Sequence, residues 1–154
     1  MATYGAANRV SDGQFTATVY GYIKEQKYNE AIAVLEPELA NFPESRAALS
    51  LLGHCHYYIG QFDQAAAMYE RLTKLLPESE DYKLHYAQCL YKAGSYLESQ
   101  KAAAKVDGSE KEVSLLQIAA AYEQEDMATC RRLLDRCPDN DADAMVNRGE
   151  CLKD

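Results

Sequence analysis

Apolar residues recur along this chain with the spacing of helix faces, and the whole pattern repeats at an interval of 34 residues. In the best-formed unit, the packing face of the first helix carries Leu49, Leu52, Gly53 and His56. The second helix carries Ala65, Tyr69 and Leu72. The interval relates these pairs: Pro43 and Pro77, Gly60 and Gly94, Phe62 and Tyr96, Ala31 and Ala65, and Cys55 and Cys89. A helix-turn-helix unit of this length cannot bury its apolar face alone, so neighbouring units are expected to stack around a continuous core.

The small residues of each unit have a predicted mechanical role. Gly53 and Ala65 are predicted to lie where the paired helices cross. A larger side chain at either position would push the helix axes apart. In the next unit Ala87 takes the crossing position, and Ser99 is expected to face it. The unit after that keeps the pattern only if the repeat shortens to about 31 residues.

The pattern predicts nine helices and no strand, since no segment alternates with the period of two that a half-buried strand requires. The predicted ranges are 11–26, 28–41, 44–59, 61–76, 78–93, 95–106, 110–124, 126–136 and 141–153. A 34-residue helix-turn-helix unit is typical of the tetratricopeptide repeat. The predicted fold class is therefore all-α, a tetratricopeptide-repeat solenoid wound as a right-handed superhelix.

The two ends differ from the rest of the pattern. Residues 1–10 show no periodic apolar positions and are predicted to form a flexible leader, with Ser11 or Asp12 as the cap of the first helix. Residues 11–154 then form an array of about four and a half repeats. The last predicted helix would leave Met145, Val146 and Leu152 uncovered. Because a terminal repeat ordinarily has a polar outer face, we expect the array to be truncated at its C-terminal end.

Composition argues against two classes of partner. The formal net charge of -8 and the pI of about 4.9 disfavour nucleic acid, because binding phosphates requires clustered Lys and Arg. No apolar run approaches the roughly 18 residues of a membrane span, and the first residues do not resemble a signal peptide. We expect a soluble intracellular protein with no nucleic-acid partner and no membrane insertion.

The five cysteines are predicted to be packing residues and not metal ligands or disulfide partners. Their number is odd, and no Cys-x-x-Cys pair occurs. Cys55, Cys89 and Cys151 fall at one site of three different first helices, as a small buried residue of a repeat would. Cys130 and Cys137, seven residues apart, share one helix face and are also expected to pack. The sequence implies no metal site and no cofactor.

The adjacent histidines and the absence of familiar motifs bear on catalysis. His54 and His56 point about 200° apart around a helix, so they cannot hold one metal ion together. His56 is expected in the core, and His54 is expected to face the concave groove. The sequence places no nucleophile beside a base in a recognisable pattern, no Gly-rich phosphate loop and no carboxylate pair at ligand spacing. We expect no catalytic residues and no enzyme activity.

The concave surface of the array is the candidate site, lined by the first helix of each unit. The register predicts nine groove residues: Tyr20, Ile23, His54, Tyr57, Tyr58, Leu84, Gln88, Tyr91 and Tyr122. Four of them form one row: Ile23, Tyr57, Tyr91 and Tyr122. Two interpretations of this row stay open. An aromatic row is ordinarily core, but tyrosine, with its polar tip, also suits the wall of a half-wet groove.

The side-chain chemistry of the groove favours one class of ligand. Repeat domains that bind carboxylate-ended tails need Lys and Asn in the groove, because an acidic terminus requires cationic partners. The positions that would form such a clamp are Thr16, Tyr20, Ser50, His54, Leu84 and Gln88. A carboxylate clamp is therefore absent. A groove of Tyr, Leu and Ile suits an extended apolar or proline-rich segment, since polyproline II is already extended before it binds.

Two runs that extend beyond the packing positions carry a more specific resemblance. Residues 12–20 read Asp-Gly-Gln-Phe-Thr-Ala-Thr-Val-Tyr, and residues 45–53 read Ser-Arg-Ala-Ala-Leu-Ser-Leu-Leu-Gly. Further agreement lies at Tyr57-Tyr58, Tyr69-Glu70, Pro77, Tyr82, Ala87-Gln88 and Leu90-Tyr91-Lys92-Ala93. With these runs, residues 11–105 resemble the amino-terminal repeats of the tetratricopeptide repeat protein 30 family, also called intraflagellar transport protein 70. The resemblance weakens after residue 105.

The resemblance implies a non-catalytic adaptor in the core of intraflagellar transport complex B, whose superhelix encircles an extended proline-rich segment of a fellow core subunit. Family members are several times longer than this chain. The resemblance further implies roles in cilium assembly and anterograde transport, at the cilium or flagellum and the ciliary base, with a cytoplasmic pool. Two alternatives stay open: a generic tetratricopeptide scaffold in another multiprotein assembly, and a targeting subunit linked to tubulin polyglutamylation.

Overall fold

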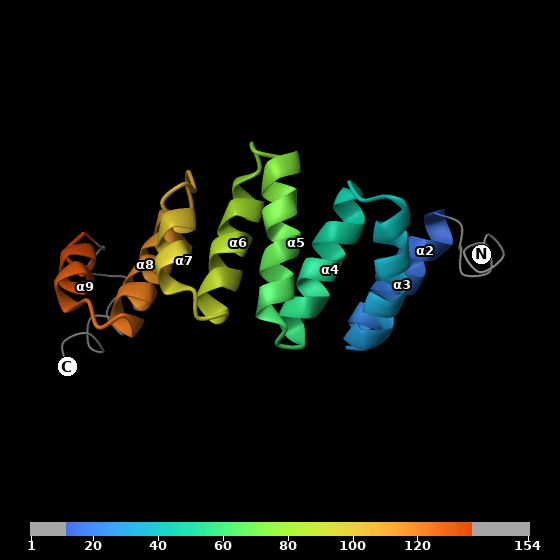
Figure 1. Ribbon diagram of the computed structural model, residues 1–154, viewed down its shortest axis with the longest axis horizontal. Helices are drawn as coiled ribbons and strands as arrows, with labels where there is room; N and C mark the ends of the chain where they lie inside the picture. Colours follow the sequence, from blue (N-terminus) through green and yellow to red (C-terminus); the bar gives the residue numbers. More distant parts are fainter. Residues whose placement is uncertain (1–11, 137–154) are drawn as a thin grey trace. The chain divides into compact units, whose positions relative to one another are not determined.

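The computed structural model describes residues 12–136, and within that range the chain forms eight α-helices and no strand (Figure 1). The helices are α2 (Asp12–Lys24), α3 (Tyr28–Asn41), α4 (Arg46–Tyr58), α5 (Phe62–Leu75), α6 (Glu80–Lys92), α7 (Tyr96–Ala103), α8 (Glu110–Glu123) and α9 (Met127–Leu134). The predicted leader and the predicted helix over 141–153 lie outside the described residues. The chain divides after Leu75 into two compact units, the first containing α2 to α5 and the second α6 to α9.

The predicted helix ranges are confirmed to within about two residues, with one exception. The predicted starts at 44 and 78 were early, because Ser45 and Ser79 at the N-cap positions have extended backbone and the helices begin one residue later. Ser45 has extended backbone and its Oγ accepts the N–H of Ala48 at 3.2 Å, which satisfies one of the free donors at the start of α4. The exception is α7, which ends at Ala103 and not at residue 106.

The four first helices within residues 12–136 end in the same turn. In each turn one residue has a positive φ: 61° at Gln26, 84° at Gly60, 87° at Gly94 and 60° at Glu125. In the turn after α4, the N–H of Gly60 donates to the carbonyl of Tyr57 at 3.1 Å, and the N–H of Gln61 donates to the carbonyl of His56 at 2.8 Å. This pattern is the Schellman motif. Because the four turn residues are separated by 34, 34 and 31 positions, the structure confirms that the repeat shortens in the second unit.

The core of the first unit forms where α2, α3 and α4 meet, and α5 packs beside α4. Its buried residues are Val19, Ala31, Ile32, Leu35, Ala48, Leu52 and Cys55. Figure 1 shows α4 and α5 as neighbouring antiparallel helices, which is the arrangement the repeat pattern predicts. The crossing residue Ala65 is fully buried, as expected.

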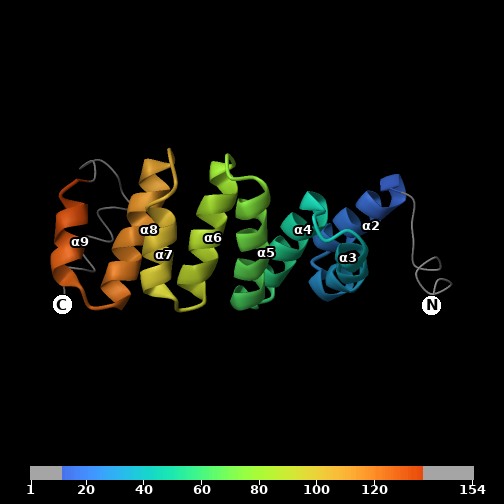
Figure 2. The same cartoon turned by 45° about the horizontal axis from the view of Figure 1, so that its top comes forward.

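In the part of the second unit that the structure describes, two smaller core clusters form. The first contains Ala87, Ala103 and Leu116, and the second contains Ile118, Ala121, Cys130 and Leu134. In Figure 2, the connections between α6, α7, α8 and α9 alternate between the two ends of the helices. The predicted contact between Ser99 and Ala87 is confirmed, since Ser99 is fully buried and its Oγ donates to the carbonyl of Ala87 at 2.8 Å.

One pair of packing positions, 16 residues apart, recurs in all four repeats with different side-chain sizes. The pairs are Val19 with Leu35, Gly53 with Tyr69, Ala87 with Ala103, and Ile118 with Leu134. At the second pair, a methyl group on Gly53 would lie 2.8 Å from Cε2 and Cζ of the Tyr69 ring. The absence of a side chain at Gly53 therefore provides the space that the ring of Tyr69 fills.

Candidate functional site

The row of Ile23, Tyr57, Tyr91 and Tyr122 occupies one structurally equivalent position in the four repeats. In each case the backbone carbonyl of the row residue accepts the N–H of the positive-φ turn residue, at distances of 3.0, 3.1, 3.0 and 2.9 Å. The row residue therefore stands in the last turn of its first helix. Its ring or branched side chain is held beside the turn that leads to the second helix.

In the first unit, five rings form a continuous group at this end of α4. We call the group of Tyr28, His54, Tyr57, Tyr58 and Phe62 the aromatic surface. Tyr28 and Tyr58 stack with ring centroids 5.5 Å apart and an interplanar angle of 14°. His54 lies 4.5 Å from Tyr58, and Tyr57 meets the edge of Phe62 at 5.3 Å. Offset stacking and edge contacts of this kind are the favourable geometries for aromatic rings.

In the aromatic surface, one ring is strongly exposed and the four rings around it are half-buried. Tyr58 is 59% exposed, whereas Tyr28, His54, Tyr57 and Phe62 are half-buried. Of the predicted groove residues, His54, Tyr57 and Tyr58 are thus brought into one group. Tyr28 was not among them; the signal that could have found it is its place 34 residues before Phe62, because aromatic residues recur at that turn position.

The equivalent tyrosines of the second unit are partly packing residues. Tyr91 lies 5.5 Å from Tyr96, centroid to centroid, and packs against the cluster that contains Ala87 and Leu116. Tyr122 packs against the cluster that contains Ile118. Both rings are half-buried. Tyr91 and Tyr122 are therefore partly core residues, since each packs against a core cluster, and partly surface residues, since each ring stays half-buried.

The remaining predicted groove residues differ in how much surface they present. Tyr20 is 56% exposed, Ile23 is half-buried against the first-unit core, and Gln88 is half-buried. Leu84 is only 9% exposed, so it presents little side chain to a partner. Helical periodicity assigns a residue to one side of its helix, but the neighbouring helices determine how much of that side stays open.

Burial of His56 was predicted and is confirmed. The ring is 7% exposed, and its Nδ1 lies 2.7 Å from Oε1 of Gln61, a hydrogen bond in which the imidazole N–H donates to the amide oxygen. Gln61 belongs to the turn between α4 and α5. The histidine therefore fixes the turn while it fills the core.

The described cysteines are buried, as predicted for Cys55, Cys89 and Cys130. Burial raises the pKa of the Cys55 thiol to about 11 and that of Cys89 to about 12. Cys130 donates through Sγ to the carbonyl of Ile118 at 3.6 Å, at the position that Ser99 occupies in the preceding repeat. Cys137 and Cys151 lie outside the described residues.

Metal-binding clusters and membrane-spanning helices are both absent from residues 12–136. In that part of the chain no three His, Cys, Asp or Glu side chains are grouped so as to hold a metal ion. No helix there is long and apolar enough to cross a membrane.

Sequence comparison identifies relatives along nearly the whole chain. The chain is 44% identical over 149 residues to intraflagellar transport protein 70A of Xenopus tropicalis and 43% identical over 145 residues to that of Danio rerio. It is 36% identical over 140 residues to a tetratricopeptide repeat protein 30 homolog of Caenorhabditis briggsae. These matches cover 96%, 93% and 90% of the chain, so the similarity continues well past residue 105, where we expected it to weaken. The chain spans 23%, 22% and 21% of the length of these relatives.

The fold has its own counterpart among solved structures. A structure described as the MamA RS-1 ArsTM double mutant superposes with a TM-score of 0.71, covering 94% of this chain and 96% of that one. Its sequence identity of 13% makes this a likeness of fold alone. A family model described as tetratricopeptide repeat matches residues 22–89. The chain therefore has a tetratricopeptide-repeat fold, and its sequence is similar to proteins named intraflagellar transport protein 70 and tetratricopeptide repeat protein 30.

Proposed function

We propose that this chain forms part of a non-catalytic adaptor subunit of intraflagellar transport complex B, which binds an extended proline-rich segment of a fellow core subunit. The proposal combines the names of the sequence relatives with the chemistry of the first helices. It places the protein at the cilium or flagellum and the ciliary base, with a cytoplasmic pool, where it supports cilium assembly and anterograde transport.

The observation that carries the proposal is the stacked pair of Tyr28 and Tyr58 with its exposed outer ring. A proline ring packs well on an aromatic face, and a polyproline II segment loses little conformational entropy when it binds. The rings of His54 and Tyr57 lie 4.5 Å and 5.6 Å from the ring of Tyr58, so we expect these contacts to reduce the ordering that binding requires of Tyr58.

The absence of Lys and Arg from the positions that would clamp a carboxylate also supports a proline-rich ligand. The positions that would clamp a carboxylate include Tyr20, Ser50 and His54 in the first unit and Leu84 and Gln88 in the second. None of these supplies the ammonium or guanidinium group that an acidic peptide terminus requires. A neutral, extended segment rich in proline matches this surface better than an acidic tail.

The test measures binding of a fluorescein-labelled decaproline peptide and of the proline-rich core subunit to the full chain, before and after Tyr58→Ala. Truncating an aromatic anchor costs about 2 kcal/mol or more, so affinity for the core subunit should fall about 30-fold. Because Tyr58 is exposed, circular dichroism should show nearly unchanged helix content. The matched control is Leu97→Ala on α7, which truncates a side chain that is 56% exposed, close to the 59% of Tyr58, but lies outside the aromatic surface. Equal affinity of wild type and Tyr58→Ala for the core subunit would contradict the proposal.

Tyr57 and Tyr91 provide a second, distinguishable measurement. Each is half-buried against the aromatic residue of its own turn, so Tyr→Ala at these positions should lower both partner affinity and thermal stability. A large loss of stability with unaltered affinity would assign both rings to packing alone. In that case the adaptor role would rest on the sequence relatives and on Tyr58.

A further inference from the structure

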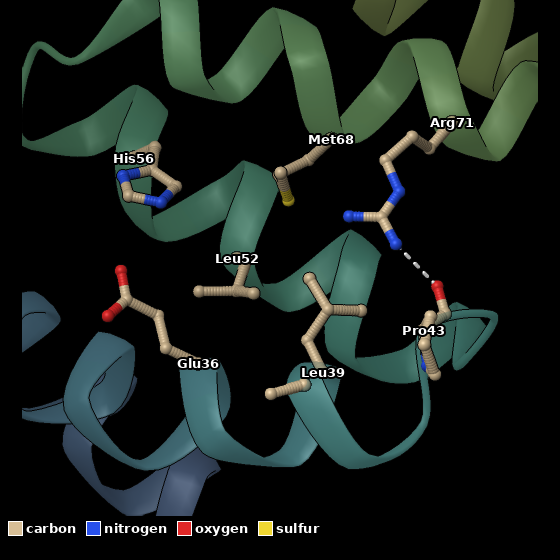
Figure 3. Close-up of a pocket in the computed structure, with 8 residues that line it drawn as sticks. Glu36, Leu39, Pro43, Leu52, His56, Met68 and Arg71 are labelled. Atoms are coloured by element: carbon tan, nitrogen blue, oxygen red, sulfur yellow. Dashed lines mark hydrogen bonds between the residues drawn. The ribbon is translucent and has the colours of Figure 1, made fainter.

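An open pocket of about 380 Å³ lies between α3, α4 and α5 of the first unit (Figure 3). Its floor is apolar and is formed by one residue from each helix: Leu39 from α3, Leu52 from α4 and Met68 from α5. The volume falls within the roughly 300–1,000 Å³ of typical ligand pockets. Methionine and leucine side chains together form a floor that adapts to aliphatic groups of different shape.

The two ends of the pocket differ in polarity. Arg71 stands at one end, where its Nη2 donates to the carbonyl of Pro43 at 2.6 Å and ties α5 to the connection before α4. Glu36 and His56 stand at the other end, and Figure 3 shows the carboxylate of Glu36 on the same side as the imidazole. Glu36 is exposed, and it forms no ion pair with another residue of the 12–136 range.

The hydrogen bond of His56 determines what this end of the pocket presents. Its Nδ1–H donates to Oε1 of Gln61, so in the neutral ring Nε2 is an acceptor. The ring is 7% exposed and lines the pocket. The end formed by Glu36 and His56 therefore presents a carboxylate and a nitrogen lone pair, both of which are hydrogen-bond acceptors.

The pocket is separate from the aromatic surface. Leu52 and His56 line the pocket, whereas His54 and Tyr58 belong to the aromatic surface. Residues two positions apart point about 200° apart around a helix, so the two sites use opposite faces of α4. One short segment cannot occupy both.

The negative charge of α3, next to the pocket, favours a ligand with a cationic group. Helix α3 carries Glu30, Glu36 and Glu38 and contains no Lys or Arg, and the whole chain has a formal net charge of -8. We propose that the pocket is a second docking site, which takes an aliphatic side chain and an adjacent Lys or Arg from a segment of a partner protein. The aliphatic side chain covers Leu39 and Met68, and the cationic group meets Glu36. The remaining guanidinium N–H groups of Arg71 donate to a carbonyl of the same segment.

The test uses the full chain with methionine methyl groups labelled with ¹³C, titrated with the acetylated and amidated peptide Gly-Gly-Lys-Leu-Leu-Gly-Gly. Binding should shift the methyl signal of Met68 and the ring signals of His56 in parallel, while the ring signals of His85 on α6 stay in place. The same peptide with Glu in place of Lys should bind at least about fivefold more weakly, because it brings a like charge to Glu36.

Two pairs of variants distinguish binding in the pocket from non-specific electrostatic attraction of the cationic peptide to the acidic chain. Ala40 is exposed and lines the pocket, so Ala40→Trp should fill it and weaken binding about tenfold, which is the loss of roughly one buried aliphatic side chain. Ala33→Trp, on the same helix but away from the pocket, should have no effect. Glu36→Gln should weaken binding about two- to fivefold. Glu38→Gln removes the same charge from a position that does not line the pocket, and should weaken binding less.

Three results would overturn the proposal. The first is the absence of shifts at Met68 and His56 at millimolar peptide. The second is equal binding of the Lys and Glu peptides, and the third is equal loss of binding in Glu36→Gln and Glu38→Gln. The two glutamine variants remain informative if Ala40→Trp does not fold. Because Tyr58→Ala leaves the pocket intact, it should not change binding of this peptide, so failure here is distinguishable from failure of the proposed adaptor function.

Discussion

The pairing of Gly53 with Tyr69 makes a sharp prediction about packing. Carbon atoms in contact prefer separations of about 3.5–4.0 Å, whereas a Cβ at Gly53 would lie 2.8 Å from two carbons of the ring. The ring would have to retreat by roughly 0.7 Å or more. The ring is only 8% exposed, so we expect its movement to displace neighbouring core atoms. Such overpacking costs about 1–3 kcal/mol.

Gly53→Val should therefore lower the free energy of unfolding by about 1–2.5 kcal/mol, because the higher helix propensity of valine returns only about 0.4 kcal/mol. Gly21 is the matched control, since it lies inside α2 and a methyl group added to it would have no neighbouring atom within 4 Å. Gly21→Val should be neutral or slightly stabilising. Urea unfolding followed by circular dichroism measures both variants.

The recurring pair also predicts a rescue. The first repeat fills the equivalent positions with Val19 and Leu35, so Gly53→Val combined with Tyr69→Leu installs a pair that this fold already accommodates. Tyr69→Leu alone should cost about 1–3 kcal/mol because it leaves space beside Gly53. The double variant should be more stable than the sum of the single effects by about 1–2 kcal/mol. Strict additivity, or a Gly53→Val variant as stable as Gly21→Val, would refute the size-complementarity reasoning.

Three other perturbations test separate features. Glu125→Gly should raise the free energy of unfolding by about 0.5–1 kcal/mol in urea unfolding, because the left-handed backbone there is strained for a residue with a Cβ; a loss of stability would contradict this. Cys55 and Cys89 should react with a thiol reagent at pH 8 only on the timescale of unfolding, because burial raises the pKa of both thiols; rapid labelling of the native protein would show otherwise. The pKa of Glu80 is lowered chiefly by the N–H of Asp107, so its contribution to stability is present above the unfolded pKa of about 4.5 and is lost as the pH falls through the lower folded value. Thermal melts of wild type and Glu80→Gln should differ at pH 7 and converge as the pH falls, and a difference that does not change with pH would refute the assignment.

The helix positions could be predicted because the sequence repeats the features that determine them. The interval between Pro43 and Pro77 marks the ends of second helices, and apolar residues at helical spacing mark the faces between. The end of α7 could not be predicted in this way. Residues 101–105 have high intrinsic helix propensity, yet the chain leaves the helix once Ala103 has entered its cluster with Ala87 and Leu116. Tertiary packing decides the boundary there.

The candidate sites were predicted unevenly for a similar reason. Periodicity placed His54, Tyr57 and Tyr58 on one side of a helix, and the structure brings their rings into contact. It could not show that Leu84 would be covered. The polar ends of the pocket come from residues on different helices, such as Glu36 and Arg71, and a single helix pattern does not reveal which of these meet.

The contrast between the constant turns and the variable second helices has a consequence for evolution and engineering. The turn inside each repeat keeps the same two backbone hydrogen bonds whether its left-handed residue is glycine or not. The shortened repeat contains an eight-residue α7, whereas α3 and α5 each have 14 residues. Insertions and deletions should therefore accumulate at the exposed connection over residues 104–109 and avoid the hairpin turns. The same connection could accept a reporter domain if the N–H of Asp107 keeps its hydrogen bond to Glu80.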